Sequence, residues 1–408
     1  MSKVTNTEAI DAARELQRTS RPLEALQLLE PLLQREASAD LLEASASVLT
    51  DLGRLQDARA RRESALVLHQ RSGERAAEAA ALHALALLAN REGKEAEARE
   101  RLERALAIRL AIGDGPGEAR TRQALGALAL NQKRLGDARA MLELARSIRA
   151  GLGEEASEAS LTMLKDLATI DMLEGKHRDA GPKLERWLDF RRSAGDRIAV
   201  MNTLRLLAAV DMRSDQNATA RPKLVEALDV AREVGSISSE VDILQLLATI
   251  DLSEGKDVVA RGRLQKALAL AEASGDRARA ASMLDLLGSG DAAAGRPVDA
   301  REQLEESLRI SRELGDRDGE ADTIEYVGLL AWRRGNRAVG AQLLAVSQYV
   351  AASKDAAPTA EAVIDGLSRI ARELGIDQAT LLESRPEAEK AYGKDRAMSL
   401  LREALRFV

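Results

Sequence analysis

Apolar residues along this chain recur at helical spacing, in pairs of helices separated by short polar turns. The stretch Leu246–Asp276, LLATIDLSEGKDVVARGRLQKALALAEASGD, shows the repeating unit. Leu244 and Leu247 lie on one face of its first predicted helix, and Ala260 and Leu264 lie on one face of its second. This pattern predicts two amphipathic helices that pack against each other as a hairpin.

Glycines mark the ends of the predicted helices. The second helix of each unit is followed by a glycine, at steps of 40, 40, 42, 40, 40 and 40 residues: Gly73, Gly113, Gly153, Gly195, Gly235, Gly275 and Gly315. The first helix is followed by Gly53, Gly93, Gly175, Gly255, Gly295 and Gly335, with Lys133 and Asp215 in the two remaining positions. Glycine suits a helix end because the backbone there often turns left-handed. Asp114, Asp196, Asp276 and Asp316 follow such glycines and are predicted N-caps.

The period predicts nine helical hairpins within residues 1–354. They span about 6–37, 39–72, 75–112, 115–152, 155–194, 197–234, 237–274, 277–314 and 317–354. The two extra residues of the 42-residue step belong to the loop at 154–157 or to the helix after it. Because each unit contacts only its neighbours, such an array forms an elongated solenoid, not separate globular domains.

Residues 355–408 depart from the repeat and are predicted to form a C-terminal helical cap. Short helices are expected at 377–384, 386–392 and 395–406. A cap would cover the apolar end that an open solenoid exposes. The alternative is a helix for self-association or for a partner.

Composition limits the class of protein. The chain has 408 residues, of which 45% are hydrophobic and 2% aromatic, and its net charge is −6 with both signs mixed. A nucleic-acid surface needs a clustered basic face, so we expect no nucleic-acid partner. The chain lacks cysteine, an apolar leader and a long apolar run. We therefore expect a cytoplasmic protein without membrane insertion, and the preference for Arg indicates a bacterial source.

The repeated pattern Leu-x-x-Leu-Ala, Gly, Ala-Arg, Leu, Ala-Leu resembles the tetratricopeptide repeat. Leu247-Ala248 matches the family's Leu-Gly pair, Gly255 its turn, and Ala260 its small residue in the second helix, with Leu264 and Ala267 as later core positions. The resemblance covers residues 6–354, and the period is similar to the 40–42-residue branch found in kinesin light chains and bacterial regulators. It implies an all-α, right-handed solenoid whose first helices line a concave groove.

Signals for catalysis or cofactor binding are absent from the sequence. His69, His83 and His177 stand in different repeats and have no metal-ligand spacing. The Gly-Lys pairs lack the other residues of a phosphate-binding loop. The segment Gly288-Ser289-Gly290 lies inside a predicted helix, so we interpret it as a place of close packing or a softened helix. We expect no enzyme activity, no metal and no cofactor.

Four aspartates interrupt the apolar pattern. Asp171, Asp211, Asp251 and Asp291 occupy one position in four successive first helices, four residues before the turn. A carboxylate there should be at least half buried, and it opposes the helix dipole. Lys183, Lys223 and Arg263 stand twelve residues on, with Gln303 in the fourth unit. One interpretation is a structural ladder of ion pairs, and the other is an acidic stripe that binds a basic ligand.

The resemblance also implies which side chains line the groove. They are Lys165, Met172, Asn202, Arg205, Met212, Arg213, Gln245, Tyr326, Trp332 and Arg333. Arginine can pair with carboxylates through two hydrogen bonds, and Met adapts to irregular shapes, so this set suits an extended peptide. The Lys and Asn set with which some family members hold a C-terminal carboxylate is not visible as a unit.

Tyr326 and Trp332 are unusual in a chain this poor in aromatic residues. They either pack on the C-terminal cap or anchor a partner. Taken together, the sequence predicts a scaffold or adaptor that binds a peptide or protein segment in the groove. The alternative is a regulatory protein whose solenoid changes shape when it binds a peptide or small molecule.

Overall fold

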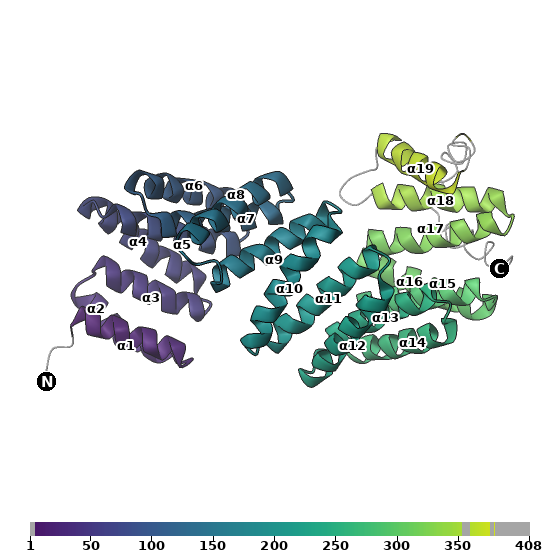
Figure 1. Ribbon diagram of the computed structural model, residues 1–408, viewed down its shortest axis with the longest axis horizontal. Coiled ribbons are helices and arrows are strands. Elements are labelled where there is room, and N and C mark those ends of the chain that lie inside the picture. Colours follow the sequence, from purple (N-terminus) through teal and green to yellow (C-terminus); the bar gives the residue numbers. More distant parts are fainter. Residues whose placement is uncertain (1–4, 353–359, 376–378, 380–408) are drawn as a thin grey trace. The chain divides into compact units, whose positions relative to one another are not determined.

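The computed structural model describes residues 5–352, 360–375 and 379, and these form nineteen helices and no strand (Figure 1). The helices belong to two compact units, Met1–Ser193 and Ala194–Val408. Successive helices pair antiparallel as nine hairpins, followed by one further helix. The predicted all-α solenoid of helical hairpins is confirmed.

Ten helices make up unit 1 and nine make up unit 2. Unit 1 contains α1 (Asn6–Arg18), α2 (Pro22–Arg35), α3 (Ala39–Asp51), α4 (Leu55–Ser72), α5 (Arg75–Arg91), α6 (Glu95–Ile112), α7 (Gly115–Asn131), α8 (Leu135–Gly151), α9 (Glu158–Leu173) and α10 (His177–Ser193). Unit 2 contains α11 (Arg197–Arg213), α12 (Asn217–Glu233), α13 (Ile237–Ser253), α14 (Asp257–Ala273), α15 (Arg277–Ala293), α16 (Pro297–Leu314), α17 (Arg317–Arg333), α18 (Arg337–Ala352) and α19 (Ala360–Leu374).

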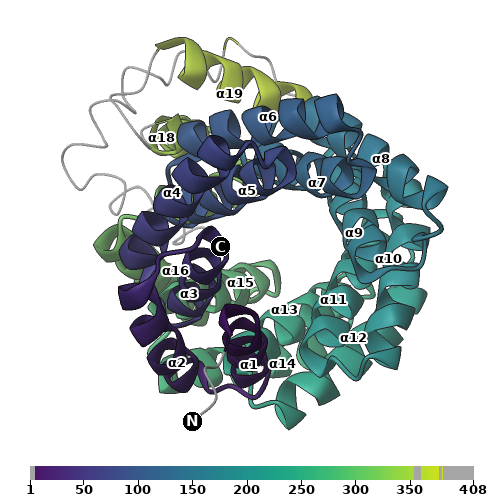
Figure 2. The same ribbon diagram turned by 90° about the vertical axis from the view of Figure 1, so that its left-hand side faces the viewer.

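The first helices of the hairpins form the inner layer of each unit. In unit 1, α1 contacts α3, α5 contacts α7, and α7 contacts α9, while α15 contacts α17 in unit 2. Figure 2 shows α5, α7 and α9 on the inner side of α6, α8 and α10. Helices that approach one another more closely lie on the inside of a bend. The inner face of each unit is therefore built from first helices.

The predicted turns adopt the backbone conformation that their residues favour. Every glycine predicted to close a helix has a positive φ, and so do Lys133 (φ 58°) and Asp215 (φ 57°), which take the place of glycine in two hairpins. The predicted N-caps are also confirmed, since Asp114, Asp196 and Asp276 each accept a hydrogen bond from the backbone N–H three residues on. The two extra residues lie in the loop between α8 and α9, which covers residues 152–157.

Small residues let the two helices of each hairpin approach closely. One position of the first helix holds Gly126, Ala168, Ala208, Ala248 and Gly288, and it faces Ala138, Ala180, Ala220, Ala260 and Ala300 of the second. A Cβ added to Gly288 would lie 2.6 Å from Leu304 Cγ, whereas one added to Gly290 would meet nothing within 4 Å. Of the two interpretations of the Gly-Ser-Gly segment, close packing applies to Gly288.

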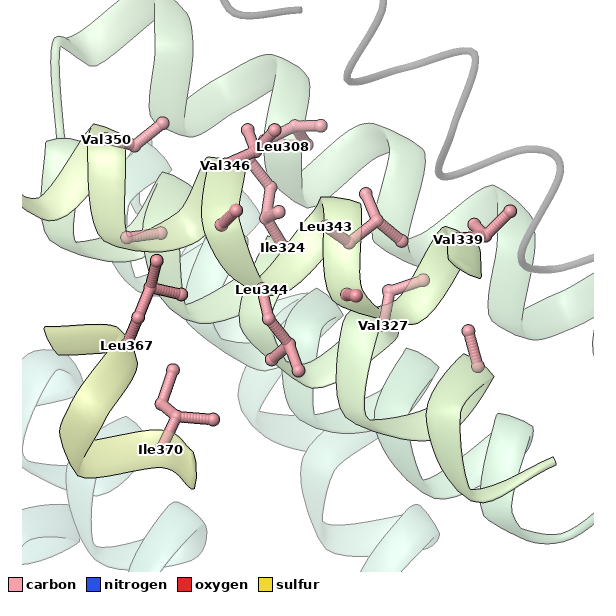
Figure 3. Packing of buried hydrophobic residues seen from close by; sticks show 14 of the residues in the cluster. Leu308, Ile324, Val327, Val339, Leu343, Leu344, Val346, Val350, Leu367 and Ile370 are labelled. Atoms are coloured by element: carbon pink, nitrogen blue, oxygen red, sulfur yellow. The ribbon is translucent and has the colours of Figure 1, made fainter. Parts of the chain in front are cut away.

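The last hairpin is covered by α19. Leu367 and Ile370 of α19 point toward α18 and join a buried cluster with Leu343, Leu344 and Val346 (Figure 3). Residues 360–374 thus bury apolar surface at the end of the repeat array. The predicted helices at 377–384, 386–392 and 395–406 lie outside the described residues, and the division between solenoid and cap at residue 354 stays a prediction.

Candidate functional site

The four repeated aspartates lie near the ends of their first helices, and two of them, Asp171 and Asp251, lie where three helices meet. Asp171, at the end of α9, is 1% exposed, and its carboxylate accepts a hydrogen bond from Arg139 of α8 at 2.7 Å and from Lys183 of α10 at 2.6 Å. Burial raises the pKa of Asp171, but the hydrogen bonds from Lys183 and Arg139 outweigh it and hold the pKa below its ordinary value. The carboxylate therefore joins its own hairpin to the preceding one.

The same arrangement recurs in unit 2. Asp251 is fully buried, pairs with Arg221 of the preceding hairpin at 2.8 Å, and also contacts Arg263 of its own hairpin. Asp291 accepts hydrogen bonds from Arg261 at 3.1 Å and from Arg296, in the turn that follows it, at 2.5 Å. We call each of these aspartates with its cations an Asp clamp.

Asp211 has the weakest of the four clamps. Lys223 donates to its carboxylate at 2.5 Å. The register position that holds Arg221 and Arg261 in the later hairpins holds Gly181 here. Consistent with this, Asp211 is 8% exposed, compared with 0–1% for the other three.

The sequence predicted one cation in each of three clamps and none in the fourth. It pointed to Lys183, Lys223 and Arg263, which contact their aspartates as the twelve-residue spacing indicated. It missed Arg139, Arg221, Arg261 and Arg296. The Ala-Arg pair near the start of most second helices is a signal that could have identified the first three, because it places an arginine beside the next hairpin.

Unit 1 also contains a clamp without the buried aspartate. Arg59 of α4 pairs with Glu92 at 2.7 Å and with Glu97 at 2.7 Å, although the Asp position holds Ala89. Glu92 matches the position of Glu174, which also contacts Arg139. An arginine at the start of one second helix thus contacts carboxylates of the next hairpin in both units.

The first helices carry a second repeated polar feature. Eight successive first helices hold a partly buried polar side chain ten residues before the turn residue. This polar column consists of Glu43, His83, Gln123 and Lys165 in unit 1 and of Arg205, Gln245, Asp285 and Glu325 in unit 2. The small-residue position three residues later holds Ala or Gly in all eight helices, whereas the charge of this position changes from repeat to repeat.

Several of the predicted groove residues belong to the polar column or contact its neighbours. Arg205 donates to Asp242 at 2.9 Å, and Asp242 also accepts from Arg279 at 2.7 Å, so these three residues link α11, α13 and α15. Lys165 pairs with Asp166 at 3.1 Å. Gln245, Met172 and Met212 are partly buried, and Asn202, Arg213 and Arg333 are exposed.

The two aromatic groove candidates contribute to packing in the described structure. The Tyr326 hydroxyl donates to the backbone oxygen of Ser289 at 2.7 Å and so joins α17 to α15. Trp332 packs against the buried cluster of the last hairpin, and the Arg337 guanidinium lies 5.8 Å from its ring centre. Packing accounts for both side chains, although each remains partly exposed.

Asp285 is the member of the polar column with the least compensated charge. Its Oδ1 is buried and accepts no hydrogen bond within the described part of the chain. Burial raises the pKa of Asp285 to about 6, which a hydrogen bond from Thr323 opposes and the charge of Asp322 reinforces. Sequence analysis missed Asp285 because an acidic residue on a first helix gives no sign of its burial.

The histidines do not converge. His69 on α4 contacts Glu74 at 3.0 Å, and His177 begins α10. His83 lies in the polar column, where burial, with the charges of Arg109 and Arg120, lowers its pKa to about 4. Among the described residues, no group of three His, Cys, Asp or Glu side chains could hold a metal ion.

None of the helices in the described ranges is long and apolar enough to cross a membrane. A comparison with curated proteins gave no significant match. Solved structures with the same fold are numerous. A signal transduction ATPase with numerous domains and a tetratricopeptide repeat sensor, from Pyrococcus horikoshii, superposes with a TM-score of 0.60 at 15% identity, covering 82% of this chain. This chain spans about half of that protein, since 51% of it is covered.

Two further structures extend this comparison. The apo form of the quorum sensor NprR from B. thuringiensis gives a TM-score of 0.54 at 14% identity, covering 74% of this chain and 86% of that protein. BtubC (BKLC) from P. vanneervenii matches at 19% identity with a TM-score of 0.44, covering 56% of this chain and 89% of that one. At these low identities, the similarities to the Pyrococcus ATPase and to NprR show the fold alone.

The family comparison agrees with the hairpin geometry. Residues 36–111 and 78–151 match the tetratricopeptide repeat family, and tetratricopeptide repeats are the only family identified. The matched residues cover α3 to α8, and hairpins of the same length, turn and small-residue packing continue to α18. Residues 36–151 therefore belong to the tetratricopeptide repeat family, and hairpins with the same period of about 40 residues continue beyond them to α18.

Proposed function

We propose that this protein is a scaffold or adaptor that binds an extended segment of a partner protein along the inner face of first helices. Tetratricopeptide repeats generally mediate protein interactions. The observation that carries the proposal is the polar column, because the repeat keeps this position polar while varying its charge. A position needed only for packing would repeat its chemistry, as the small-residue position does.

Asp285 supports a more specific form of this proposal for unit 2. Its buried Oδ1 accepts no hydrogen bond within the described residues, and Glu325 and Tyr326 stand at corresponding or adjacent positions of the next first helix. A buried carboxylate is stabilised when a cation pairs with it. We infer that a Lys or Arg side chain of the partner segment pairs with Asp285.

A second candidate is a sensor whose solenoid changes shape on binding a peptide or small molecule. It is favoured by the similarity in fold to the quorum sensor NprR and to the repeat sensor of the Pyrococcus ATPase. Both proposals place the ligand on the repeats. In neither do we assign a reaction, and we expect the protein to act by binding, without enzyme activity.

Capture with the intact chain separates the two candidates. The tagged protein is used to recover partners, which are identified by mass spectrometry, and the purified chain is screened against small molecules by thermal shift. A scaffold should recover a protein partner whose binding decreases when Asp285 is replaced by Asn. Stabilisation by one small molecule, without a protein partner, would favour the sensor.

A further inference from the structure

One hairpin of unit 1 has the cations of an Asp clamp without the aspartate. In unit 2, Arg261 and Arg296 both donate to Asp291, and the hollow that these groups line has a volume of about 20 Å³. Unit 1 holds Arg99 and Arg134 at the same register positions, while the position of Asp291 holds Ala129. Two arginines therefore border a position from which the carboxylate is missing.

The other polar positions around Ala129 also hold neutral side chains. The clamp glutamate seen at Glu92, Glu174 and Glu254 is replaced by Gln132, and the position of the second-helix cation holds Met141. As a result, a cavity of about 190 Å³ opens between α6 and α8, on the outer side of α7. Leu106, Leu125 and Leu128 line it together with Met141.

The carboxylates that pair with the two arginines at the rim are exposed, and Arg134 also donates to the partly buried Gln132 at 3.2 Å. Arg99 pairs with Glu103 at 2.8 Å, and Arg134 pairs with Asp137 at 2.7 Å. Both carboxylates are more than half exposed, 56% for Glu103 and 62% for Asp137. Exposed pairs within one helix are weak, so they do not prevent the guanidinium groups from turning toward an incoming anion.

We propose that this cavity binds a carboxylate attached to a short apolar body. The carboxylate takes the place that Asp291 occupies in unit 2 and pairs with Arg99 and Arg134, while the apolar body contacts the leucines and Met141. The volume suits a ligand of this size, because an engineered apolar cavity of about 150 Å³ binds benzene. The carboxylate comes either from a free acid or from a Glu side chain flanked by apolar residues in a peptide.

Titration calorimetry on the full chain tests the proposal with matched probes. Hexanoate is compared with hexanamide, which has the same apolar body without the charge, and a second arm uses the capped peptide acetyl-Leu-Glu-Leu-amide. Three proteins are compared: the wild type, Ala129→Asp, and the double variant Arg99→Gln/Arg134→Gln. The double variant changes partly exposed side chains only and keeps the test valid if Ala129→Asp does not fold.

We expect the charged probe to bind the wild type about tenfold more tightly than the neutral one, a difference of about 1.4 kcal/mol, because hydrogen bonds to a charged group are stronger than those between neutral groups. Ala129→Asp should abolish binding by supplying the missing carboxylate, and the double variant should remove the preference for charge. Binding of hexanoate identifies a free acid as a ligand source, and binding of the peptide alone identifies a Glu side chain.

Three results would overturn the proposal. The first is equal binding of hexanoate and hexanamide, and the second is undiminished binding by a folded Ala129→Asp or by the double variant. The third is the absence of binding by both hexanoate and the peptide. None of these results bears on the inner face, so the proposed function can fail or stand independently.

Discussion

At the scale of single residues, two aspartates of unit 2 are buried in opposite electrostatic surroundings. Asp251 is fully buried with two arginines, one from each of two hairpins. Asp285 has no paired cation among the described residues, and the charge that acts on it is that of another carboxylate, Asp322. Removing the charge should therefore lower the stability of the protein at Asp251 and raise it at Asp285.

Asp251→Asn should destabilise the protein. Removing one partner of a buried ion pair costs about 3–5 kcal/mol when the remaining charge stays buried, and we expect about 2–4 kcal/mol because Arg221 and Arg263 are partly exposed. Urea unfolding followed by circular dichroism measures the change. Asp229→Asn is the control, since that side chain is 65% exposed and should change stability by less than about 0.5 kcal/mol. Equal stability of Asp251→Asn and the control would exclude a structural role for the clamp.

Asp285→Asn should stabilise the protein above pH 6. The folded pKa of about 6 exceeds the ordinary 3.8, so the native state retains a proton that the unfolded chain has lost. Stability therefore falls as pH rises from about 4 to about 6, by about 3 kcal/mol at most, because each pKa unit corresponds to about 1.4 kcal/mol. The variant should unfold at higher urea than the wild type at pH 7 and at similar urea at pH 4. A wild-type advantage at pH 7 would contradict this.

At the scale of the helix, the hairpin depends on small residues where the two helices touch. Gly288 lies against Leu304 and the backbone of Ala300, whereas Gly290, two residues on, has open space around it. Both glycines stand in the interior of α15 and share the same low helix propensity.

Gly288→Ala and Gly290→Ala form a matched pair for this contact. Gly290→Ala should stabilise α15 by about 0.5–1 kcal/mol through helix propensity alone. Gly288→Ala should instead destabilise by about 1–2 kcal/mol, because overpacking forces Leu304 to move. Thermal unfolding of the two variants gives the comparison. If both substitutions raise the melting temperature equally, the contact between the two helices does not require a glycine at position 288.

The helices could be predicted from the sequence because their ends are encoded locally. A glycine at the turn and an aspartate three residues before the N–H that it caps act through nearby backbone, so the hairpins and even the unusual turns at Lys133 and Asp215 follow from spacing. The second half of each Asp clamp could not be predicted in this way. Arg221 lies thirty residues before Asp251, and only the packing of one hairpin on the next brings them together.

The candidate site was predicted less completely than the fold. Lys165, Arg205 and Gln245 were predicted to face the groove, and they share a register with Asp285 and Glu325, which were not among the predicted residues. A sequence does not show which charged residue of a helix is buried without a partner. The cavity beside Ala129 could not be predicted either, because it forms where alanine replaces the aspartate at the contact between two hairpins.

At the scale of the whole molecule, the clamps and the inner face divide the polar residues between two tasks. Arg139 with Asp171 in unit 1 and Arg221 with Asp251 in unit 2 connect successive hairpins. The charge of the polar column varies from repeat to repeat, and we propose that this column faces the inner side. In this view the clamps maintain the repeat array and the column selects the partner.

The most direct test of this division compares the two Asp→Asn variants for affinity toward the captured partner. Calorimetry at a temperature well below both melting points should show that Asp285→Asn binds at least about tenfold more weakly, the effect of losing one charged hydrogen bond. Asp251→Asn should bind like the wild type despite its lower stability. Loss of binding in Asp251→Asn together with wild-type affinity in Asp285→Asn would contradict the assignment of binding to the inner face.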